Sequence, residues 1–112
     1  MFSILIPTYN KINYLKLCLS SIKKNSKFNH QIIIHINEGT DGSLEYVRNN
    51  GHEYTYSKIN KGVCVSYNKA ASLAKNKYIV LMQDDMYFCP DWDFVFNENI
   101  EQIKEEDFFL SG

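Results

Sequence analysis

Two adjacent carboxylates, Asp84 and Asp85, directly follow a short hydrophobic run that ends at Met82. Neighbouring ionised Asp side chains repel each other, so such a pair is favoured where a divalent cation holds it. A strand that ends in this pair carries it to the edge of an α/β sheet where ligands bind. The pair therefore predicts a metal and nucleotide site, with an exposed acidic turn as the alternative.

Three more polar segments follow predicted strands: Pro7 to Asn10, Asn37 to Ser43 and Asn60 to Gly62. Parallel strands open their carboxyl ends on one edge of a sheet, so carboxylates, amides, hydroxyls and one Lys are expected to converge there. The sequence has no G-x-G-x-x-G after the first strand and no G-x-x-x-x-G-K-[ST]. A dinucleotide-dependent oxidoreductase and a P-loop NTPase are therefore both disfavoured.

The elements that must position these loops alternate between strand and helix patterns. Buried, Ile-rich or Val- and Tyr-containing runs predict strands at residues 2–6, 31–36, 54–57 and 78–82. Apolar residues at helical spacing predict a helix after each of these strands. This alternation indicates βαβ units and a three-layer α/β/α, Rossmann-like domain with a mostly parallel sheet. The pattern leaves the order of the strands open.

Several local features are expected from residue type. Pro7 should end the first strand, and Asn10 should cap the helix that follows it. Asp91 and Asp93 should stabilise the start of the last helix through its dipole and carry no chemistry. Two helices are expected to bury one face each, formed by Val63, Tyr67, Ala70, Ala71 and Ala74, and by Trp92, Val95, Phe96, Ile100 and Ile103. A last strand is predicted at Phe108 to Leu110.

Composition limits the class of protein. The 112 residues predict one domain, and the 45% hydrophobic and 22% charged content is typical of a globular protein. A net charge of −1 does not favour nucleic acid as the partner. The longest apolar runs are strand-sized, which predicts no transmembrane segment and no signal peptide. Three Cys without metal-ligand spacing favour a reducing, cytoplasmic location, and the three scattered His residues predict no shared metal site.

The chain resembles a known family in three segments: Ser3 to Asn10, Asn37 to Ser43, and the strand that ends in Asp84-Asp85. In this order they look like the family 2 inverting glycosyltransferases of the GT-A fold, and the resemblance covers essentially the whole chain. It implies that residues 1–112 form the donor-binding part of such an enzyme. The acceptor-binding half, which would supply the catalytic base, is expected to be absent, and no catalytic residue is identified here.

The resemblance also implies roles for residues that would bind the nucleotide. Pro7 and Tyr9 would line the base pocket, with the Tyr9 ring against the base, and Thr8 would belong to the same nucleotide-binding set. Glu38 stands where the family usually has the second Asp of an Asp-Asp-Gly-Ser loop, and it would accept a hydrogen bond from the base. Because Asn37 and Glu38 replace the usual acidic pair, the base preference stays open.

At the other end of the donor, Lys61 would contact phosphate and Asp84 would bind the ribose or nearby sugar. Asp85 would ligate Mn²⁺ or Mg²⁺, and the metal would stabilise the departing nucleotide. Gln83 stands where many relatives have an acid. The expected partners are a nucleotide diphosphate sugar and an unknown acceptor, which is a saccharide, a lipid-linked group or a protein.

Three hypotheses follow for function. The first is transfer of a sugar from a nucleotide diphosphate donor to an acceptor hydroxyl with inversion. The alternative is a nucleotide-sugar-binding or interaction half-domain that lacks catalysis. A phospho-acceptor receiver domain is disfavoured, because it needs its acidic pair after the first strand, where Pro7 to Asn10 stand. An early end to the sheet would leave an exposed edge, which predicts self-association, with a homodimer as the simplest form.

Overall fold

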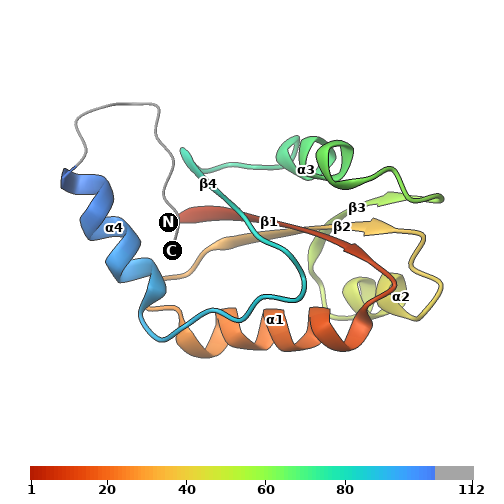
Figure 1. Ribbon diagram of the computed structural model, residues 1–112, viewed down its shortest axis with the longest axis horizontal. Coiled ribbons are helices and arrows are strands. Elements are labelled where there is room, and N and C mark those ends of the chain that lie inside the picture. The colour runs from red at the N-terminus through yellow and green to blue at the C-terminus, as the bar shows by residue number, and fades with distance from the viewer. Residues whose placement is uncertain (103–112) are drawn as a thin grey trace.

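The computed structural model describes residues 1–102 and shows alternating strands and helices (Figure 1). The elements are β1 (Phe2–Tyr9), α1 (Ile12–Asn25), β2 (Gln31–Asn37), α2 (Ser43–Asn49), β3 (Glu53–Ser57), α3 (Val63–Ala71), β4 (Tyr78–Leu81) and α4 (Trp92–Gln102). The predicted α/β class is confirmed. No helix in this part of the chain is long and apolar enough to cross a membrane.

The four strands form one parallel sheet in the order β3-β2-β1-β4. In the register, Leu5 of β1 lies opposite Ile33 on the β2 side and Leu81 on the β4 side. The chain therefore moves from β1 outward through β2 to β3, and then crosses back to place β4 on the free side of β1. Such a change of direction marks the place where open α/β sheets bind their ligands.

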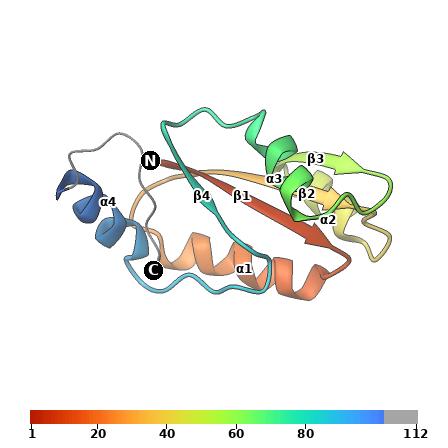
Figure 2. The same ribbon diagram turned by 45° about the horizontal axis from the view of Figure 1, so that its top comes forward.

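Helices cover both faces of the sheet, as the three-layer prediction required. α1 and α2 lie on one face and α3 lies on the other, while α4 extends past the end of α1 (Figures 1 and 2). The larger core joins Ile4, Ile6, Ile34 and Ile36 of the sheet to α1 and α2, and a smaller one joins Leu5 and Ile33 to Ala70 of α3. Alternate residues of β1 and β2 thus enter opposite cores, which explains the nearly continuous apolar sequence of these two strands.

The prediction that Pro7 ends the first strand is wrong, because β1 continues to Tyr9. The carbonyl of Leu5 points to β4 and accepts a hydrogen bond from Met82 N–H at 3.0 Å. Pro7 stands two residues later in the strand, so its backbone nitrogen points to the same side. Pairing with β4 reaches only as far as Leu5. The missing N–H of Pro7 therefore faces a side where the ladder has already ended, and the strand loses no hydrogen bond.

Two helix positions also differ from the prediction. Val63 and Val95 were expected to face the core, but both side chains are exposed. The first turns already contain buried residues, Ser66 in α3 and Trp92 and Asp93 in α4. Tyr67 and Phe96 are partly buried against the cores, so the buried faces of the two helices leave out Val63 and Val95. Ile103 and the strand predicted at Phe108 to Leu110 lie outside the described residues.

Each of the two outer strands has one neighbouring strand in the part of the chain described. β3 pairs only with β2, and β4 pairs only with β1. On β4, Ile79 and Leu81 are about half exposed beside the α3 face of the sheet. Open edges and exposed apolar side chains are the features that motivated the expectation of self-association, which stays a prediction.

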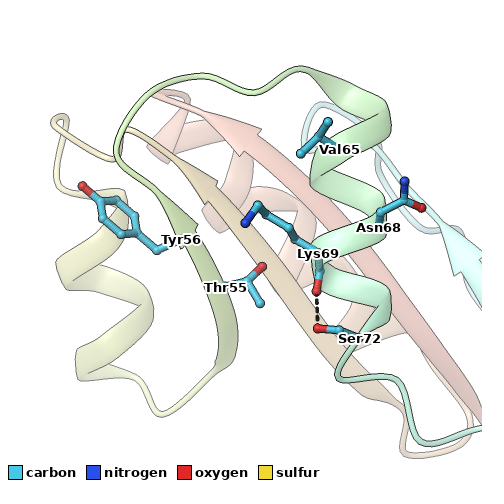
Figure 3. Close-up of a pocket in the computed structure, with 6 residues that line it drawn as sticks. All are labelled: Thr55, Tyr56, Val65, Asn68, Lys69 and Ser72. Atoms are coloured by element: carbon cyan, nitrogen blue, oxygen red, sulfur yellow. Dashed lines mark hydrogen bonds between the residues drawn. The ribbon is translucent and has the colours of Figure 1, made fainter.

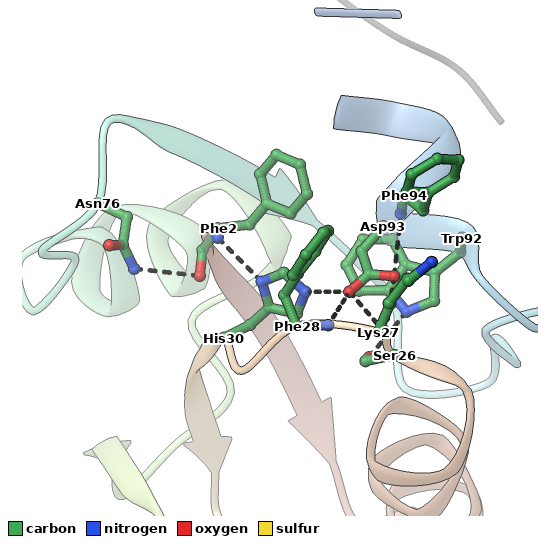
Figure 4. A network of polar contacts seen from close by, with 9 residues as sticks. All are labelled: Phe2, Ser26, Lys27, Phe28, His30, Asn76, Trp92, Asp93 and Phe94. Atoms are coloured by element: carbon green, nitrogen blue, oxygen red, sulfur yellow. Dashed lines mark hydrogen bonds and ion pairs between the residues drawn. The ribbon is translucent and has the colours of Figure 1, made fainter. Parts of the chain in front are cut away.

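Asp93 is the strongest tie between the last helix and the rest of the domain (Figure 4). Its carboxylate is fully buried and accepts hydrogen bonds from Lys27 N–H, Phe28 N–H and His30 Nε2, at 2.7–2.9 Å. The expectation that Asp93 acts only on the helix dipole is therefore too weak. It is a buried structural anion that holds the loop after α1 against the start of α4.

The partners of His30 define its tautomer. Its Nδ1 faces the backbone N–H of Phe2 at 3.0 Å, and a backbone N–H can only donate. Nδ1 is thus the acceptor, and the ring proton lies on Nε2, facing Asp93. Burial acts to raise the pKa of Asp93, but the hydrogen bonds from Lys27, Phe28 and His30 outweigh it and lower that pKa below its usual value.

We predict that Asp93→Asn lowers the free energy of unfolding at pH 7 by about 2–4 kcal/mol, because it replaces a triply hydrogen-bonded buried carboxylate. A carboxylate with a lowered pKa stabilises the fold above its unfolded pKa, and this stability is lost as the pH falls through the folded value. The difference between the two proteins should therefore shrink below about pH 4. Urea unfolding at several pH values measures it.

The matched control is Asp91→Asn, two residues earlier and exposed, which should leave the unfolding midpoint nearly unchanged. Equal midpoints for the Asp93→Asn variant and the unaltered protein at pH 7 would contradict the structural role assigned to Asp93.

Candidate functional site

The loops after β1 and β4 diverge at the switch point of the sheet, and their side chains meet there. Thr8, at the end of β1, donates its hydroxyl hydrogen to Oδ2 of Asp84 at 2.7 Å, across 76 residues of sequence. Both side chains are buried, with Asp84 only 8% exposed. The structure thus brings together two of the predicted site residues in direct contact.

Asp84 carries an electrostatic cost. Burial raises its pKa, and the neighbouring Asp85 acts in the same direction, while the Thr8 hydroxyl and the positive charge of Lys11 act against them. The net effect is a raised pKa, so the ionised form is destabilised where it stands. A cation close to this carboxylate would reverse that penalty, since an opposite charge nearby favours ionisation.

Asp85 differs from its neighbour in being exposed. The pair is therefore divided into one buried carboxylate held by Thr8 and one open to ligands. No group of three or more His, Cys, Asp or Glu side chains with metal-binding geometry occurs within residues 1–102. Two oxygen-donor carboxylates nevertheless fit Mg²⁺ or Mn²⁺, which typically take one or two carboxylates and complete their coordination with water and phosphate oxygens.

Cys18 of α1 lies beneath the two carboxylates. Its pKa is raised to about 12 by burial first and then by the negative charges of Asp84 and Asp85. Its Sγ lies 3.9 Å from the carbonyl oxygen of Gln83. A thiol with so high a pKa stays protonated at neutral pH and is not a nucleophile or a metal ligand. Cys18 is a core residue that supports the turn carrying the acids.

Tyr9 and Pro7 complete the β1 side of the site. Tyr9 is the last residue of β1, lies opposite Asn37 in the parallel register, and is 46% exposed. Pro7, two residues earlier, is partly buried. An exposed aromatic ring at the end of a central strand offers a face on which a flat ligand can stack. The roles of both residues in a base pocket stay predictions.

Asn37 is a functional candidate that sequence reasoning missed. Its side chain is almost fully buried, and its Nδ2 donates to the carbonyl of Thr8 at 3.3 Å and to Oγ of Ser66 at 2.9 Å. Its Oδ1 accepts from the backbone N–H of Lys61 at 3.1 Å. One amide thus joins β1, β2, the loop after β3 and α3. The sequence feature that could have identified Asn37 is its position at the end of a buried, Ile-rich strand. A buried amide must be hydrogen-bonded, so it indicates a partner in the neighbouring elements.

Glu38 follows in a left-handed backbone conformation, with φ of 62°. Its N–H donates to the carbonyl of Ser57 at 2.8 Å, which fixes the loop to the end of β3. Gly39 has φ of 68°, and a Cβ there would lie 2.6 Å from Cγ2 of Ile36. The sharp turn therefore requires Gly39. A non-glycine residue held at positive φ stores about 1 kcal/mol or more of strain, often beside functional sites.

The expectation that Asn10 caps α1 is wrong. Asn10 has φ of 48° and instead exchanges hydrogen bonds with Thr40, 3.1 Å from Nδ2 to the Thr hydroxyl and 3.0 Å from the Thr N–H to Oδ1. The cap comes from Asp41, which accepts from Ile12 N–H at 2.9 Å and from Ser43 N–H at 3.1 Å. One carboxylate therefore caps both α1 and α2.

Asp41 is held in its ionised form by these contacts. Burial acts to raise its pKa, but the hydrogen bonds from Ser43 and Ile12 prevail, and the pKa is lowered. An anion at two helix starts is also favoured by both helix dipoles. The interpretation of the Gly39 to Ser43 segment as turn and cap chemistry is confirmed, and the loops after β1 and β2 form one rigid unit.

Lys61 reaches the site through its backbone. Its N–H is tied to Asn37, while its side chain is exposed, and the next residue, Gly62, has φ of 83° and precedes α3. All seven predicted site residues therefore stand at the carboxyl edge of the sheet: Pro7, Thr8, Tyr9, Glu38, Lys61, Asp84 and Asp85. Only Thr8 and Asp84 are in direct contact, and Asn37 links Thr8 to Lys61.

A groove lies between β3 and α3 (Figure 3), and a second polar cluster stands beside it, between β2 and β3. The buried ring of His35 lies 2.7 Å from the Thr55 hydroxyl and 3.1 Å from the Ser57 hydroxyl. Burial lowers the pKa of His35, and the positive charge of Lys69 adds to this effect. The groove beside it, lined by Thr55, Lys69 and Ser72 among others, contains none of the predicted site residues. The cluster joins β2 to β3.

Comparison with known proteins places the chain in context. The profile of the family described as "Glycosyl transferase family 2" matches residues 3–108. The chain is 34% identical over 95 residues to a chondroitin synthase of Pasteurella multocida, covering 81% of this chain and 10% of that protein. It is 36% identical over 93 residues to an abequosyltransferase of Salmonella typhimurium, covering 76% of this chain and 28% of that protein.

Solved structures share the fold. TarS of S. aureus, residues 1–349 in complex with UDP, has a TM-score of 0.73 at 21% identity, covering 90% of this chain and 32% of TarS. A mannosyltransferase of Pyrobaculum calidifontis in complex with GDP-Man and Mn²⁺ has a TM-score of 0.70 at 21% identity, covering 86% and 30%. The GT-A fold is thus confirmed, and the chain spans about a tenth to a third of these proteins.

We predict that Asn37→Ala leaves the Lys61 N–H without its acceptor and removes the donor that Asn37 offers to the Ser66 hydroxyl, which keeps its own bond to the Gly62 carbonyl. The loss should cost about 2–3 kcal/mol of unfolding free energy. Hydrogen exchange at the Lys61 amide should accelerate more than exchange in the centre of β2. The control is Asn60→Ala in the same loop, an exposed residue whose Oδ1 accepts only from Gly62 N–H. If both variants lose equal stability and equal protection at Lys61, Asn37 does not organise the loops.

We also predict that Thr8→Val raises the pKa of Asp84 further, because it removes the hydrogen bond that favours the ionised carboxylate. A carboxyl-carbon NMR titration of the metal-free protein measures this directly. Thr40→Val, which removes a hydroxyl that contacts no carboxylate in the described structure, is the control and should leave Asp84 unchanged. An unaltered Asp84 titration in the Thr8→Val variant would show that the bond does not hold the carboxylate.

Proposed function

The chain belongs to glycosyl transferase family 2, and on that premise we propose that its strand-end site binds a nucleotide diphosphate sugar together with Mn²⁺ or Mg²⁺. The protein that contains this domain would transfer the sugar to an acceptor hydroxyl with inversion. The observation that carries the proposal is the divided acidic pair, with Asp84 buried against Thr8 and Asp85 exposed at the switch point of the sheet.

Each end of the donor has a place at this edge. The exposed ring of Tyr9 would stack on the base, with Pro7 beside it and Glu38 accepting a hydrogen bond from a base N–H. Thr8 holds Oδ2 of Asp84, and the proposal assigns the other carboxylate oxygen to a ribose hydroxyl. Lys61, at the start of α3, would meet the phosphates with its charged side chain.

Asp85 would hold the cation against the diphosphate. When bound, the cation supplies positive charge that stabilises the diphosphate as a leaving group. The protein's own contribution is to keep one carboxylate fixed and a second one accessible, so that binding requires no rearrangement of the buried acid. The presence of UDP in the TarS structure and of GDP-Man with Mn²⁺ in the mannosyltransferase structure supports this assignment.

Inversion needs a general base that removes the proton of the acceptor hydroxyl. No described residue is assigned that role. We expect the base in the part of such an enzyme that the longer relatives have beyond the region aligned with this chain. The transfer step is therefore proposed for the protein that contains this domain. Donor binding is proposed for the chain itself.

We predict that Mn²⁺ strengthens the binding of UDP or GDP to the 112-residue chain, and that Asp85→Ala reduces this gain at least about tenfold because it removes a metal ligand. Isothermal titration calorimetry with each nucleotide, with and without Mn²⁺, measures the effect. Asp91→Asn removes an exposed carboxylate outside the candidate site and serves as the control, because Asn tolerates the φ of 57° at this position. Equal affinity with and without Mn²⁺ in the unaltered chain would overturn the proposed metal role.

A transfer assay separates the two functions suggested for this family member. Metal-dependent nucleotide binding without sugar transfer by the chain alone supports the donor-binding role assigned to it. Sugar transfer by the purified chain would show that the described domain contains a catalytic base that the proposal has not identified.

A further inference from the structure

The net charge of −1 conceals a strong segregation of charge along the chain. Residues 1–37 contain five Lys and no Asp or Glu, so all 13 acidic residues follow Asn37. The five lysines, Lys11, Lys16, Lys23, Lys24 and Lys27, lie on α1 or directly beside its ends. The fold thus concentrates the positive charge of the first third of the sequence on one helix.

The outer side of α1 carries most of this charge. Its inner side is buried through Leu15, Cys18, Leu19 and Ile22. The exposed residues of the outer side and of the loop that follows form what we name the α1 face: Lys16, Leu17, Ser20, Lys23, Lys24, Lys27 and Phe28. The helix has 14 residues, which corresponds to a length of about 21 Å.

Among the side chains that the structure describes, the lysines of the α1 face have no carboxylate partner, and the lysine that does pair with a carboxylate is Lys75, with Glu53. The Lys16 ammonium instead lies 5.0 Å from the centre of the Tyr46 ring, and that of Lys27 lies 4.5 Å from the centre of the Phe94 ring. A cation over an aromatic ring keeps its full charge. The positive potential of this face is therefore not neutralised from within.

Asp84 and Asp85 act on α1 from its inner side, at Cys18. Two further acids contact the helix near its ends. Asp41 caps its first turn and is engaged there by Ile12 and Ser43, and the N–H of Asp91 bonds to the carbonyl of Asn25 at its last turn. Between these ends, a groove runs from α1 towards α2. Its lining has no acidic side chain and includes Lys16, Ser20, Lys23, Lys27, Asn50 and His52.

Apolar side chains stand among these lysines. Leu17 is 55% exposed in the middle of the outer side, and Phe28 is 41% exposed beside Lys27. Lysines spread along a helix, with an aliphatic and an aromatic side chain between them, suit a flat anionic surface into which apolar groups can enter. Nucleic acid fits less well, because the whole chain has an isoelectric point near 6.3 and the centre of the face is aliphatic.

We propose that the α1 face binds the surface of a lipid bilayer that carries anionic headgroups, with Leu17 and Phe28 entering the interface. α1 begins beside the strand-end edge and runs back along the sheet, on the side away from α3 (Figure 1). A bilayer against α1 therefore lies to the side of the candidate site and leaves its edge open. The proposal does not depend on the function of that site.

The test is sedimentation of the full chain with vesicles of phosphatidylcholine that contain about a third phosphatidylglycerol, at low and at physiological salt. The triple variant Lys16→Gln, Lys23→Gln, Lys24→Gln should bind these vesicles roughly a hundredfold more weakly. The matched control is Lys69→Gln, Lys75→Gln, Lys77→Gln, which removes the same charge from the α3 side and should bind as the unaltered chain does. Leu17→Ser should weaken binding at physiological salt with its charge unchanged.

Four outcomes would overturn the proposal. These are equal binding to pure phosphatidylcholine vesicles, an equal loss in both triple variants, displacement from the vesicles by millimolar inorganic phosphate, and tighter binding to duplex DNA than to vesicles at equal phosphate concentration. Vesicle binding does not require that the candidate site bind a nucleotide. Sedimentation with vesicles therefore tests the α1 face, and calorimetry with nucleotides separately tests donor binding.

Discussion

The structure depends on β1 as the central strand, with parallel partners on both sides. Its hydrogen bonds are divided between β2, along its whole length, and β4, which pairs only with residues 2–5. This unequal division leaves the last four residues of β1 free on one side. The segment that follows β4 turns into that space, where Asp84 accepts a hydrogen bond from Thr8. The site exists because one neighbour of β1 ends early.

Polar side chains at the strand ends then turn four separate loops into one rigid edge. The buried amide of Asn37 joins three of them. The carboxylate of Asp41 caps two helices. Hydrogen bonds between Asn10 and Thr40 connect the loops after β1 and β2. A constellation that binds a ligand must be held in place before the ligand arrives. These residues supply that support, whereas Tyr9, Lys61 and Asp85 stay exposed and available.

The two buried Asp residues illustrate opposite uses of the same group. Asp93 accepts hydrogen bonds from three residues after α1 and from Phe94 N–H of its own helix, and its pKa is lowered, so its charge stabilises the fold. Asp84 has one hydroxyl and an acidic neighbour, and its raised pKa means that its charge costs stability at neutral pH. Residues that bind ligands are often suboptimal for stability, because a bound cation or polar group is what offsets their burial. The contrast distinguishes a structural anion, Asp93, from the carboxylate that is proposed to bind the donor, Asp84.

The assignment of seven site residues rested on the resemblance to a known family. Periodicity and residue type in the sequence were sufficient to predict the α/β class, the positions of the four strands and helices, and the polar segments at the strand ends. These depend on local patterns, namely apolar runs, helical spacing and polar segments after each strand, which one stretch of chain carries by itself. The order β3-β2-β1-β4, the passage of β1 through Pro7, the cap from Asp41, and the burial of Asn37 and Asp93 were decided only by the tertiary structure. Each depends on a partner 20 or more residues away in the sequence, as does the hydrogen bond between Thr8 and Asp84. Contacts between such distant residues produce no periodic pattern in the sequence. The acidic pair could be recognised from the chain alone, but which of its two carboxylates is buried and which is open to a ligand depends on the strand beside it.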